Sequence, residues 1–374
     1  MSDADGLYIG LMSGTSADAI DAALCSFVPR PRLLAALEHP WPAMLRRQLL
    51  TIAQGEQPVD LDALGHLDTA IGNTLADAAG ALLAKAGVAA SAVRAIGSHG
   101  QTLRHRPDGP LPFTLQLGDA WVIAEHTGID TVADFRRADV AAGGQGAPLL
   151  PAFHSRVLAT PGQDCAVVNL GGIANLTLLA ADGHVLGFDT GPANGLMDAW
   201  CQRHRGKPYD HDGAFAASGH CDQILLDQLL ADAYFQRPPP KSTGREYFQL
   251  AWLDGFPRVA QLAPADVQTT LLALTVESIA RALHDHAPDA RSVFLCGGGV
   301  HNAALLRALT QALTPRTVAS TAVAGVDPDY LEAMGFAWLA RQHLLGLPGN
   351  LPAVTGARGL RVLGSLHTAM RPHA

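Results

Sequence analysis

Three short loops of small residues have the composition of phosphate-binding turns. Each follows an apolar run typical of a buried strand, and they are Ser13-Gly14-Thr15-Ser16, Gly171-Gly172 and Gly297-Gly298-Gly299. Glycine lacks the Cβ that keeps a ligand away from the backbone, so several N–H groups can converge on an anion. Any one of these loops is explained as simply by a tight turn. The ordered set of three favours a nucleotide site.

The two commonest nucleotide-binding motifs are missing from the sequence. No Gly-x-x-x-x-Gly-Lys-Ser/Thr segment occurs, and no Gly-x-Gly-x-x-Gly segment lies between a strand and a helix. A nucleotide would therefore be held by a different class of fold.

Asp189 is the first candidate for acid–base chemistry. It stands between Phe188 and the turn Thr190-Gly191-Pro192, at the end of an apolar run. An Asp in this place can cap the following helix. It can equally act as a general base that takes a proton from a reacting group. From the sequence alone, helix capping and general-base catalysis explain Asp189 equally well.

The elements that position these residues form two similar series. Apolar runs at Leu7–Met12 and Ile20–Val28 flank the first loop. This pattern favours a strand–loop–strand unit, with strand–loop–helix as the alternative. The segment Cys165–Leu179, interrupted by Gly171-Gly172, repeats that pattern. We therefore expect two related lobes, residues 1–162 and 163–374, with the last helix free to return to the first lobe.

The remaining pattern alternates strands with helices. Helical spacing of apolar residues predicts four helices, at Leu61–Lys85, Asp266–Asp285, Asn302–Leu313 and Pro328–Leu345. Strands are expected at Ala92–Ser98, Ile129–Phe135 and Ser292–Cys296. This alternation predicts an α/β fold with mixed sheets. The glycine-rich stretch Ala141–Pro148 reads as a hinge or functional loop.

Composition narrows the class of partner. The chain has 374 residues, 48% of them hydrophobic and 16% charged, with a formal net charge of −8. Dispersed Lys and Arg argue against nucleic-acid binding, so we expect a small-molecule partner. The five cysteines are scattered and suggest buried, reduced thiols. The acidic N-terminus and the lack of a long apolar run predict no signal peptide, no membrane association and a cytoplasmic location.

Eight blocks of sequence resemble the anhydro-N-acetylmuramic acid kinase family, in order along nearly the whole chain. The blocks are Gly10–Ser16, Ser98–Thr102, Asp134–Arg136, Asn169–Asn175, Phe188–Pro192, Lys241–Glu246, Cys296–Gly299 and Glu332–Phe336. The resemblance implies the two-lobed actin-like (ribonuclease H-like) ATPase fold, with mixed sheets flanked by helices. The sequence departs from the family pattern at Ala17, Ala19 and Ala193. Its first strand also lacks the Asp that many actin-like kinases offer to magnesium.

The resemblance also implies ATP and Mg²⁺ as cofactors and a homodimer. It implies that ATP phosphorylates 1,6-anhydro-N-acetylmuramic acid while water opens the anhydro ring, giving N-acetylmuramic acid 6-phosphate in cell-wall recycling. The residues expected at the nucleotide are Gly14, Thr15, Ser16, Ala17, Asp18, Ala19, Ile20, Asp21, Gly171, Gly172, Asn175, Gly297, Gly298, Gly299 and Asn302. No residue is assigned to the magnesium ion.

The expected catalytic pair is Asp189, as general base, and Glu332, as a second acid that positions water or substrate. His99 and Gln101 are expected sugar contacts, although a single His is often structural. Arg136 is the candidate partner of the sugar's lactyl carboxylate. An exposed Arg at a strand end explains that residue equally well.

Three other functions fit part of the pattern. The first is another actin-like sugar or acyl-phosphate kinase that acts on a free hydroxyl group. The second is a phosphatase or nucleotide hydrolase of the same fold, and the third is a non-catalytic, ATP-regulated binding protein.

Overall fold

The computed structural model describes residues 6–14, 17–54, 59–160, 162–244 and 247–370. The chain divides into two compact units, the first formed by residues 1–153 and 330–374 and the second by residues 154–329. The boundary expected from the sequence lies a few residues later, between 162 and 163. The structure also places the C-terminal segment, with the last long helix, in the first unit.

A six-stranded mixed sheet lies at the centre of the first unit, in the order β13-β7-β4-β1-β2-β3. Its strands are β1 (Leu7–Met12), β2 (Ala19–Ser26), β3 (Arg32–Pro40), β4 (Val93–Ser98), β7 (Thr131–Ala133) and β13 (Ser365–His367). Strands β1, β2 and β3 are antiparallel neighbours, whereas β4 runs parallel to β1 and β7 parallel to β4. The predicted strand–loop–strand start of the chain is therefore confirmed.

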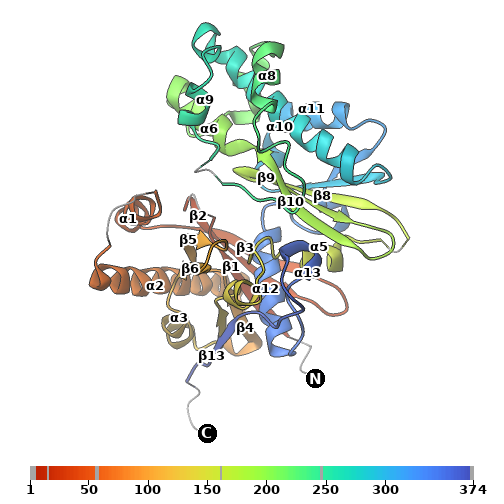
Figure 1. Ribbon diagram of the computed structural model, residues 1–374. Helices are drawn as coiled ribbons and strands as arrows, with labels where there is room; N and C mark the ends of the chain where they lie inside the picture. Colours follow the sequence, from red (N-terminus) through yellow and green to blue (C-terminus); the bar gives the residue numbers. More distant parts are fainter. Residues whose placement is uncertain (1–5, 15–16, 55–58, 161, 245–246, 371–374) are drawn as a thin grey trace. The chain divides into compact units, whose positions relative to one another are not determined.

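Helix α12 (Leu331–Leu344) packs directly on β1 and β4 of this sheet. In Figure 1 this blue helix lies among the red and orange strands, so the end of the chain meets its beginning. The close approach depends on Gly10, because a Cβ there would overlap the carbonyl group of Ala333. Glu332 lies in the first turn of this helix, next to Ala333.

The other helices of the first unit include the long α2 (Leu61–Ala86), predicted from its apolar spacing. Asp60 caps its N-terminus and the left-handed Gly87 ends it. The shorter elements are α1 (Ala43–Gln54), α3 (Ala120–Thr127), α4 (Arg137–Ala141), α5 (Pro151–Val157, at the boundary of the units), α13 (Pro352–Thr355) and a two-stranded sheet of β5 (Gln101–Arg106) and β6 (Phe113–Leu117).

The second unit contains a five-stranded sheet in the order β10-β9-β8-β11-β12. Its strands are β8 (Cys165–Leu170), β9 (Ile173–Leu179), β10 (Val185–Pro192), β11 (Ser292–Cys296) and β12 (Thr317–Ser320). The first three are an antiparallel meander, and β11 runs parallel to β8 and β12. Numbered within each unit, the order third–second–first–fourth–fifth occurs in both sheets. This repeat is the ribonuclease H-like arrangement, so the expected fold class is confirmed.

Helices cover this second sheet. The long α10 (Pro264–His286) buries Leu271, Leu274, Ile279 and Leu283 against it, and each such side chain contributes roughly 1.5–3 kcal/mol of hydrophobic stabilisation. The other helices are α6 (Asn194–Arg205), α7 (Ala214–Ala217), α8 (Gln223–Leu230), α9 (Leu250–Asp254) and α11 (Ala303–Ala312). Each unit thus has a hydrophobic core of its own.

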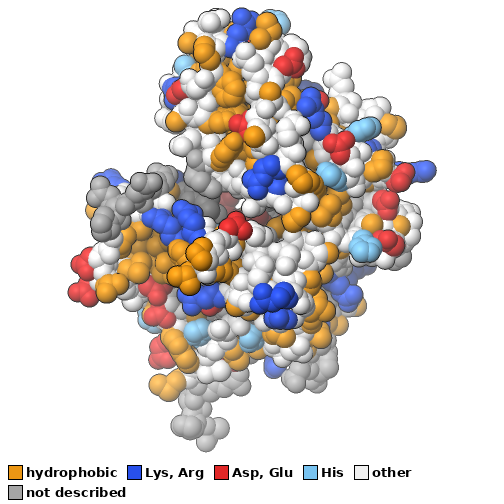
Figure 2. Space-filling view, viewed as in Figure 1, with side chains coloured by type: hydrophobic (Ala, Val, Ile, Leu, Met, Phe, Trp, Pro, Cys, Tyr) orange, Lys and Arg blue, Asp and Glu red, His pale blue; other side chains and the backbone are white. Residues whose placement is uncertain are grey.

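Several general expectations can be compared with this structure. The five cysteines are free thiols, but Cys221 is exposed, so the expectation of burial is wrong for that residue. None of the helices in the described ranges is long and apolar enough to span a bilayer. On the face drawn in Figure 2, Lys and Arg side chains lie scattered among acidic and apolar ones.

Candidate active site

The first loop, between β1 and β2, is held by three side chains of the first unit. The side-chain amide of Gln101 donates from Nε2 to the Gly14 carbonyl oxygen at 3.0 Å. Trp41 donates from Nε1 to Ser13 Oγ at 3.2 Å. Arg46 donates from Nε to the Ala17 carbonyl at 2.7 Å and pairs with Asp18 through Nη2, also at 2.7 Å. The carbonyl groups of Gly14 and Ala17 are therefore turned toward side chains of the same unit.

Arg136 occupies a fixed position behind that loop. Its Nε and Nη2 lie 3.2 and 2.9 Å from His99 Nε2, and its Nη1 donates to the Gly146 carbonyl at 2.8 Å. Burial lowers the pKa of Arg136 to about 10, although the negative charges of Glu332 and Asp139 act in the opposite direction. The guanidinium therefore remains a cation near neutral pH, with Glu332 as a neighbouring charge.

His99 is a neutral acceptor in this arrangement. Burial and, next, the charge of Arg136 hold the pKa of His99 well below its usual value. The ring also lies 4.7 Å, centroid to centroid, from Phe336 of α12. His105, on the next strand, has its pKa lowered to about 4 by burial and by the same cation. The expected contacts His99 and Gln101 are thus brought together with Gly14, Arg136 and Glu332 in the first unit.

Asp189 lies at an irregular end of β10 in the second unit. Thr190 is an extra residue in the pairing with β9, because Asp189 pairs with Asn175 and Gly191 already with Ala174. Bulges of this kind re-aim side chains at the edge of a sheet. The N-cap of α6 is Ala193, so Asp189 does not cap that helix. Of the two interpretations of Asp189, the structure contradicts the capping one.

A returning segment of the chain holds both the backbone and the carboxylate of Asp189. The Thr243 N–H donates to Asp189 Oδ2 at 2.9 Å. The Asp189 N–H donates to the Lys241 carbonyl at 3.0 Å, and the Tyr234 hydroxyl donates to the Asp189 carbonyl at 2.7 Å. Burial, and then the charge of Asp189, raises the pKa of the Tyr234 phenol. The phenol therefore stays protonated and serves as a donor.

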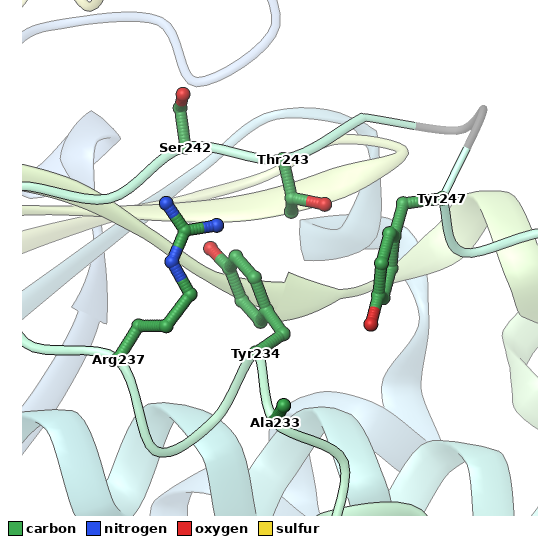
Figure 3. A pocket seen from close by; sticks show the side chains of 6 residues that line it. All are labelled: Ala233, Tyr234, Arg237, Ser242, Thr243 and Tyr247. Atoms are coloured by element: carbon green, nitrogen blue, oxygen red, sulfur yellow. The ribbon is translucent and has the colours of Figure 1, made fainter.

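A pocket opens beside this carboxylate within the second unit (Figure 3). It has a volume of about 320 Å³ and is lined by Ala233, Tyr234, Arg237, Ser242, Thr243 and Tyr247. Figure 3 shows the Arg237 guanidinium beside the Tyr234 hydroxyl, with Tyr247 across the opening. Hydroxyl groups and a cation next to an acid suit a polar, hydroxyl-bearing ligand.

The two glycine loops of the second unit are neighbours because β8 and β11 are adjacent. Cys296 pairs with Asn169, and Asn169 with Asn175, which in turn faces Asp189. Register partners share one face of a sheet, so Asp189, Asn175 and Asn169 form a polar row. At the end of this row, Gly297 lies against Asn169, and Gly299 against Leu170.

Each of these loops lies at the start of a helix. The N–H groups of Asn194 and Gly195, at the start of α6, donate to the carbonyls of Gly171 and Gly172 at 3.0 and 3.1 Å. Asn302 caps α11 by accepting the Leu305 N–H at 3.0 Å. Around Gly298 there is open space where a side chain would stand. This space leaves backbone exposed to a ligand.

A family model described as anhydro-N-acetylmuramic acid kinase matches residues 6–369. The chain belongs to this family. A protein of Xanthomonas campestris pv. campestris (strain 8004) named anhydro-N-acetylmuramic acid kinase is 59% identical over 367 residues, which are 97% of each chain. Proteins of that name from Xylella fastidiosa and Coxiella burnetii are 56% and 48% identical, over 97% and 96% of this chain and 96% and 97% of their own.

Solved structures resemble the chain more distantly. Component A of (R)-2-hydroxyglutaryl-CoA dehydratase from Acidaminococcus fermentans superposes with a TM-score of 0.48 and 11% identity, over 90% of this chain and 98% of its own. A ROK family glucokinase from Streptomyces griseus gives 0.42 and 14%, over 90% and 100%. Similarity at this level says nothing about the reaction.

Some residues expected at the nucleotide lie outside the described part of the chain or within a strand. Thr15 and Ser16 fall outside the described residues. Ala19, Ile20 and Asp21 belong to β2, and the Ile20 side chain is buried in the core. Ala193 has φ −126° and ψ −120°, outside the main allowed regions, and Ala17 has a positive φ of 48°. The described part of the chain holds no group of three or more His, Cys, Asp or Glu placed to bind a metal.

Several contacts of the site were not singled out from the sequence. Lys241 and Thr243 lie within a block that resembles the family, so a signal existed, but nothing in the block says that it reaches Asp189. Arg46 carries no signal at all. It comes from α1, which is recognisable only as an amphipathic helix, and it meets the first loop through the fold.

Proposed function

We propose that this chain uses ATP to phosphorylate 1,6-anhydro-N-acetylmuramic acid while water opens the anhydro bridge, giving N-acetylmuramic acid 6-phosphate in peptidoglycan recycling. Family membership along residues 6–369 supports the reaction. The observation that carries it is the carboxylate of Asp189, which is held by the Thr243 N–H at the bulged end of β10. A carboxylate fixed in this way can accept a proton without changing its orientation.

Asp189 is the proposed general base. Water adds to the anomeric carbon as the bond from that carbon to O6 breaks, and the proton of the water passes to Asp189. The released O6 forms a bond to the γ-phosphorus as the bond to the β-phosphate oxygen breaks, which releases ADP. Glu332 is the proposed second acid, which orients the water or the sugar. The two steps assist each other, because ring opening creates the alkoxide that attacks the phosphate.

The proposed phosphate donors come from both units. In the first unit they are the loop residues Gly14, Thr15, Ser16, Ala17 and Asp18, with Ala19, Ile20 and Asp21 continuing into β2. In the second unit they are Gly171, Gly172 and Asn175. Gly297, Gly298, Gly299 and Asn302 are proposed to hold the adenosine, where the open space at Gly298 supports a close approach of the ligand.

Mg²⁺ is proposed to arrive with the nucleotide. Mg²⁺ is commonly held by phosphates, waters and one or two carboxylates. When bound, it neutralises charge on the phosphate oxygens.

Arg136 is proposed to bind the lactyl carboxylate, with His99 and Gln101 near the sugar. Its guanidinium has five N–H donors, of which His99 and Gly146 account for three. A cation whose plane is already fixed loses little freedom when a carboxylate binds. We also propose a cytoplasmic homodimer that binds neither nucleic acid nor membrane, on the basis of the family resemblance and the composition.

Turnover in ¹⁸O-labelled water tests the reaction. The purified protein with ATP and 1,6-anhydro-N-acetylmuramic acid should give a sugar phosphate with one solvent oxygen at the anomeric position. The reaction must be quenched and analysed promptly, because the anomeric hydroxyl of the product itself exchanges with water over time and would gain label without the enzyme. Parallel reactions with hexoses and amino sugars that carry a free 6-hydroxyl identify the alternative kinase. Preferred turnover of those sugars would reject the proposal.

A further inference from the structure

Asp139, on α4, has a carboxylate that is completely buried in the first unit. Its Oδ2 accepts the Gly146 N–H at 2.8 Å. Its Oδ1 accepts hydrogen bonds from Asn350 Nδ2 at 2.8 Å and Thr355 Oγ1 at 2.7 Å. A buried carboxylate is tolerated only with such partners. Asp139 therefore joins the glycine-rich stretch 141–148 to the C-terminal segment of the chain.

The loop at residues 143–146 is shaped around this carboxylate. Gly146 has a φ of +65°, and a Cβ on Gly144 would overlap Asp139 Oδ2. The Gly144 N–H donates to the Asp139 carbonyl at 2.9 Å, and the Gln145 N–H donates to the Thr355 carbonyl at 2.7 Å. The glycines of this stretch therefore serve a fixed loop rather than a hinge.

The same loop also contacts Arg136, the residue that precedes α4. Gly146 contacts Asp139 through its N–H and Arg136 through its carbonyl oxygen, at 2.8 Å in both cases. His99 provides the other fixed acceptor of the guanidinium. Two acceptors on different elements determine the plane of the guanidinium, and one of them is positioned by Asp139.

We propose that Asp139 is a positioning residue for recognition of the substrate's carboxylate, acting on Arg136 through the backbone of Gly146. This inference rests on the proposed function. Asp139 itself is buried away from any ligand surface of the first unit, so its effect on a sugar passes through Arg136. Asn350 and Thr355, in the C-terminal segment, hold the Asp139 carboxylate in place by donating hydrogen bonds to it.

The test uses the discrimination between 1,6-anhydro-N-acetylmuramic acid and its methyl ester, measured as the ratio of their kcat/KM values. In Asp139→Asn the side chain has one acceptor oxygen, so its amide group must face either the Gly146 N–H or the pair Asn350 and Thr355. The ratio should then fall by roughly tenfold or more, while the KM for ATP stays within about twofold. A purely structural role would lower kcat/KM equally for the acid and its methyl ester. The ratio would then stay unchanged, which would overturn the proposal.

A milder variant covers the case in which Asp139→Asn does not fold. Thr355→Val removes one hydrogen bond from Oδ1 and should lower the ratio by about threefold. Thr74→Val, which removes a buried threonine hydroxyl on α2 of the same unit, should leave it unchanged. An unaltered ratio in folded Thr355→Val would also overturn the proposal. Absence of turnover in the wild-type protein would instead reject the proposed function.

Discussion

The carboxylate of Asp189 accepts the backbone N–H of Thr243 at 2.9 Å, across 54 residues of sequence. The same segment accepts the Asp189 N–H through the Lys241 carbonyl at 3.0 Å. A backbone donor positions a carboxylate without introducing a proton that could be transferred at neutral pH. The geometry thus fixes the orientation of the acid at the bulged end of β10.

Tyr234 should contribute to turnover through the backbone of Asp189. Tyr234→Phe keeps the ring and removes the hydroxyl that donates to the Asp189 carbonyl at 2.7 Å. A lost hydrogen bond is worth about 1 kcal/mol, so kcat should fall by about fivefold with little change in the KM for ATP. Steady-state kinetics at saturating sugar measure this effect.

Tyr247→Phe is the matched control, because its hydroxyl donates to Asp232 at 2.8 Å instead. It lines the same pocket, so a loss confined to Tyr234→Phe separates an effect on Asp189 from a general change of the pocket. Equal kcat values for Tyr234→Phe and the wild-type protein would contradict the role of Tyr234.

Two glycine substitutions should have opposite effects on stability. Gly10→Ala places a methyl group against the Ala333 carbonyl of α12 and should lower the free energy of unfolding by about 3 kcal/mol or more. Gly80→Ala lies inside α2 with open space around it and should raise that free energy by roughly 0.5–1 kcal/mol. Urea unfolding followed by circular dichroism measures both, and a stable Gly10→Ala would contradict the close packing of α12 on β1.

Buried neutral histidines should make the protein less stable in mild acid. Burial lowers the pKa of His154 to about 3, and burial with the charge of Arg136 lowers that of His105 to about 4. The unfolded chain protonates these rings below about pH 6.5, whereas the folded protein does not. Stability is therefore lost as pH falls from about 6.5 toward the folded pKa values.

His154→Gln isolates one of these contributions. Between pH 7.5 and 5.5 the wild-type protein should lose about 1 kcal/mol more of its unfolding free energy than the variant does. Identical pH dependence in His154→Gln and the wild-type protein would show that His154 is not held neutral.

The sequence predicts local elements well where one apolar pattern dominates. The runs at Leu7–Met12 and Ile20–Val28 became β1 and β2, and the spacing from Leu61 produced α2 with Gly87 at its end. The glycine loops were expected at strand ends and lie there. These features depend on neighbouring residues, so they can be read from a short stretch of chain.

Long-range hydrogen bonds escaped prediction for a physical reason. The donor to Asp189 is a backbone N–H, and every residue except proline has one, so residue type carries no information. Asp139 precedes the stretch Ala141–Pro148, which reads as a hinge or functional loop. It was not singled out from the sequence because its partners Asn350 and Thr355 follow 211 and 216 residues later. The unit boundary was also misjudged by several residues, since the chain crosses between the units within α5.

The most direct test of the proposed base is Asp189→Asn. The amide oxygen can still accept the Thr243 N–H, but the side chain no longer takes up a proton from water. Turnover of 1,6-anhydro-N-acetylmuramic acid should fall by about 10³-fold or more, with the dissociation constant for ATP within about twofold of wild type. Asp182→Asn, in the exposed turn between β9 and β10, should turn over normally. A kcat for Asp189→Asn within about tenfold of the wild-type value would contradict the assignment of Asp189 as the base.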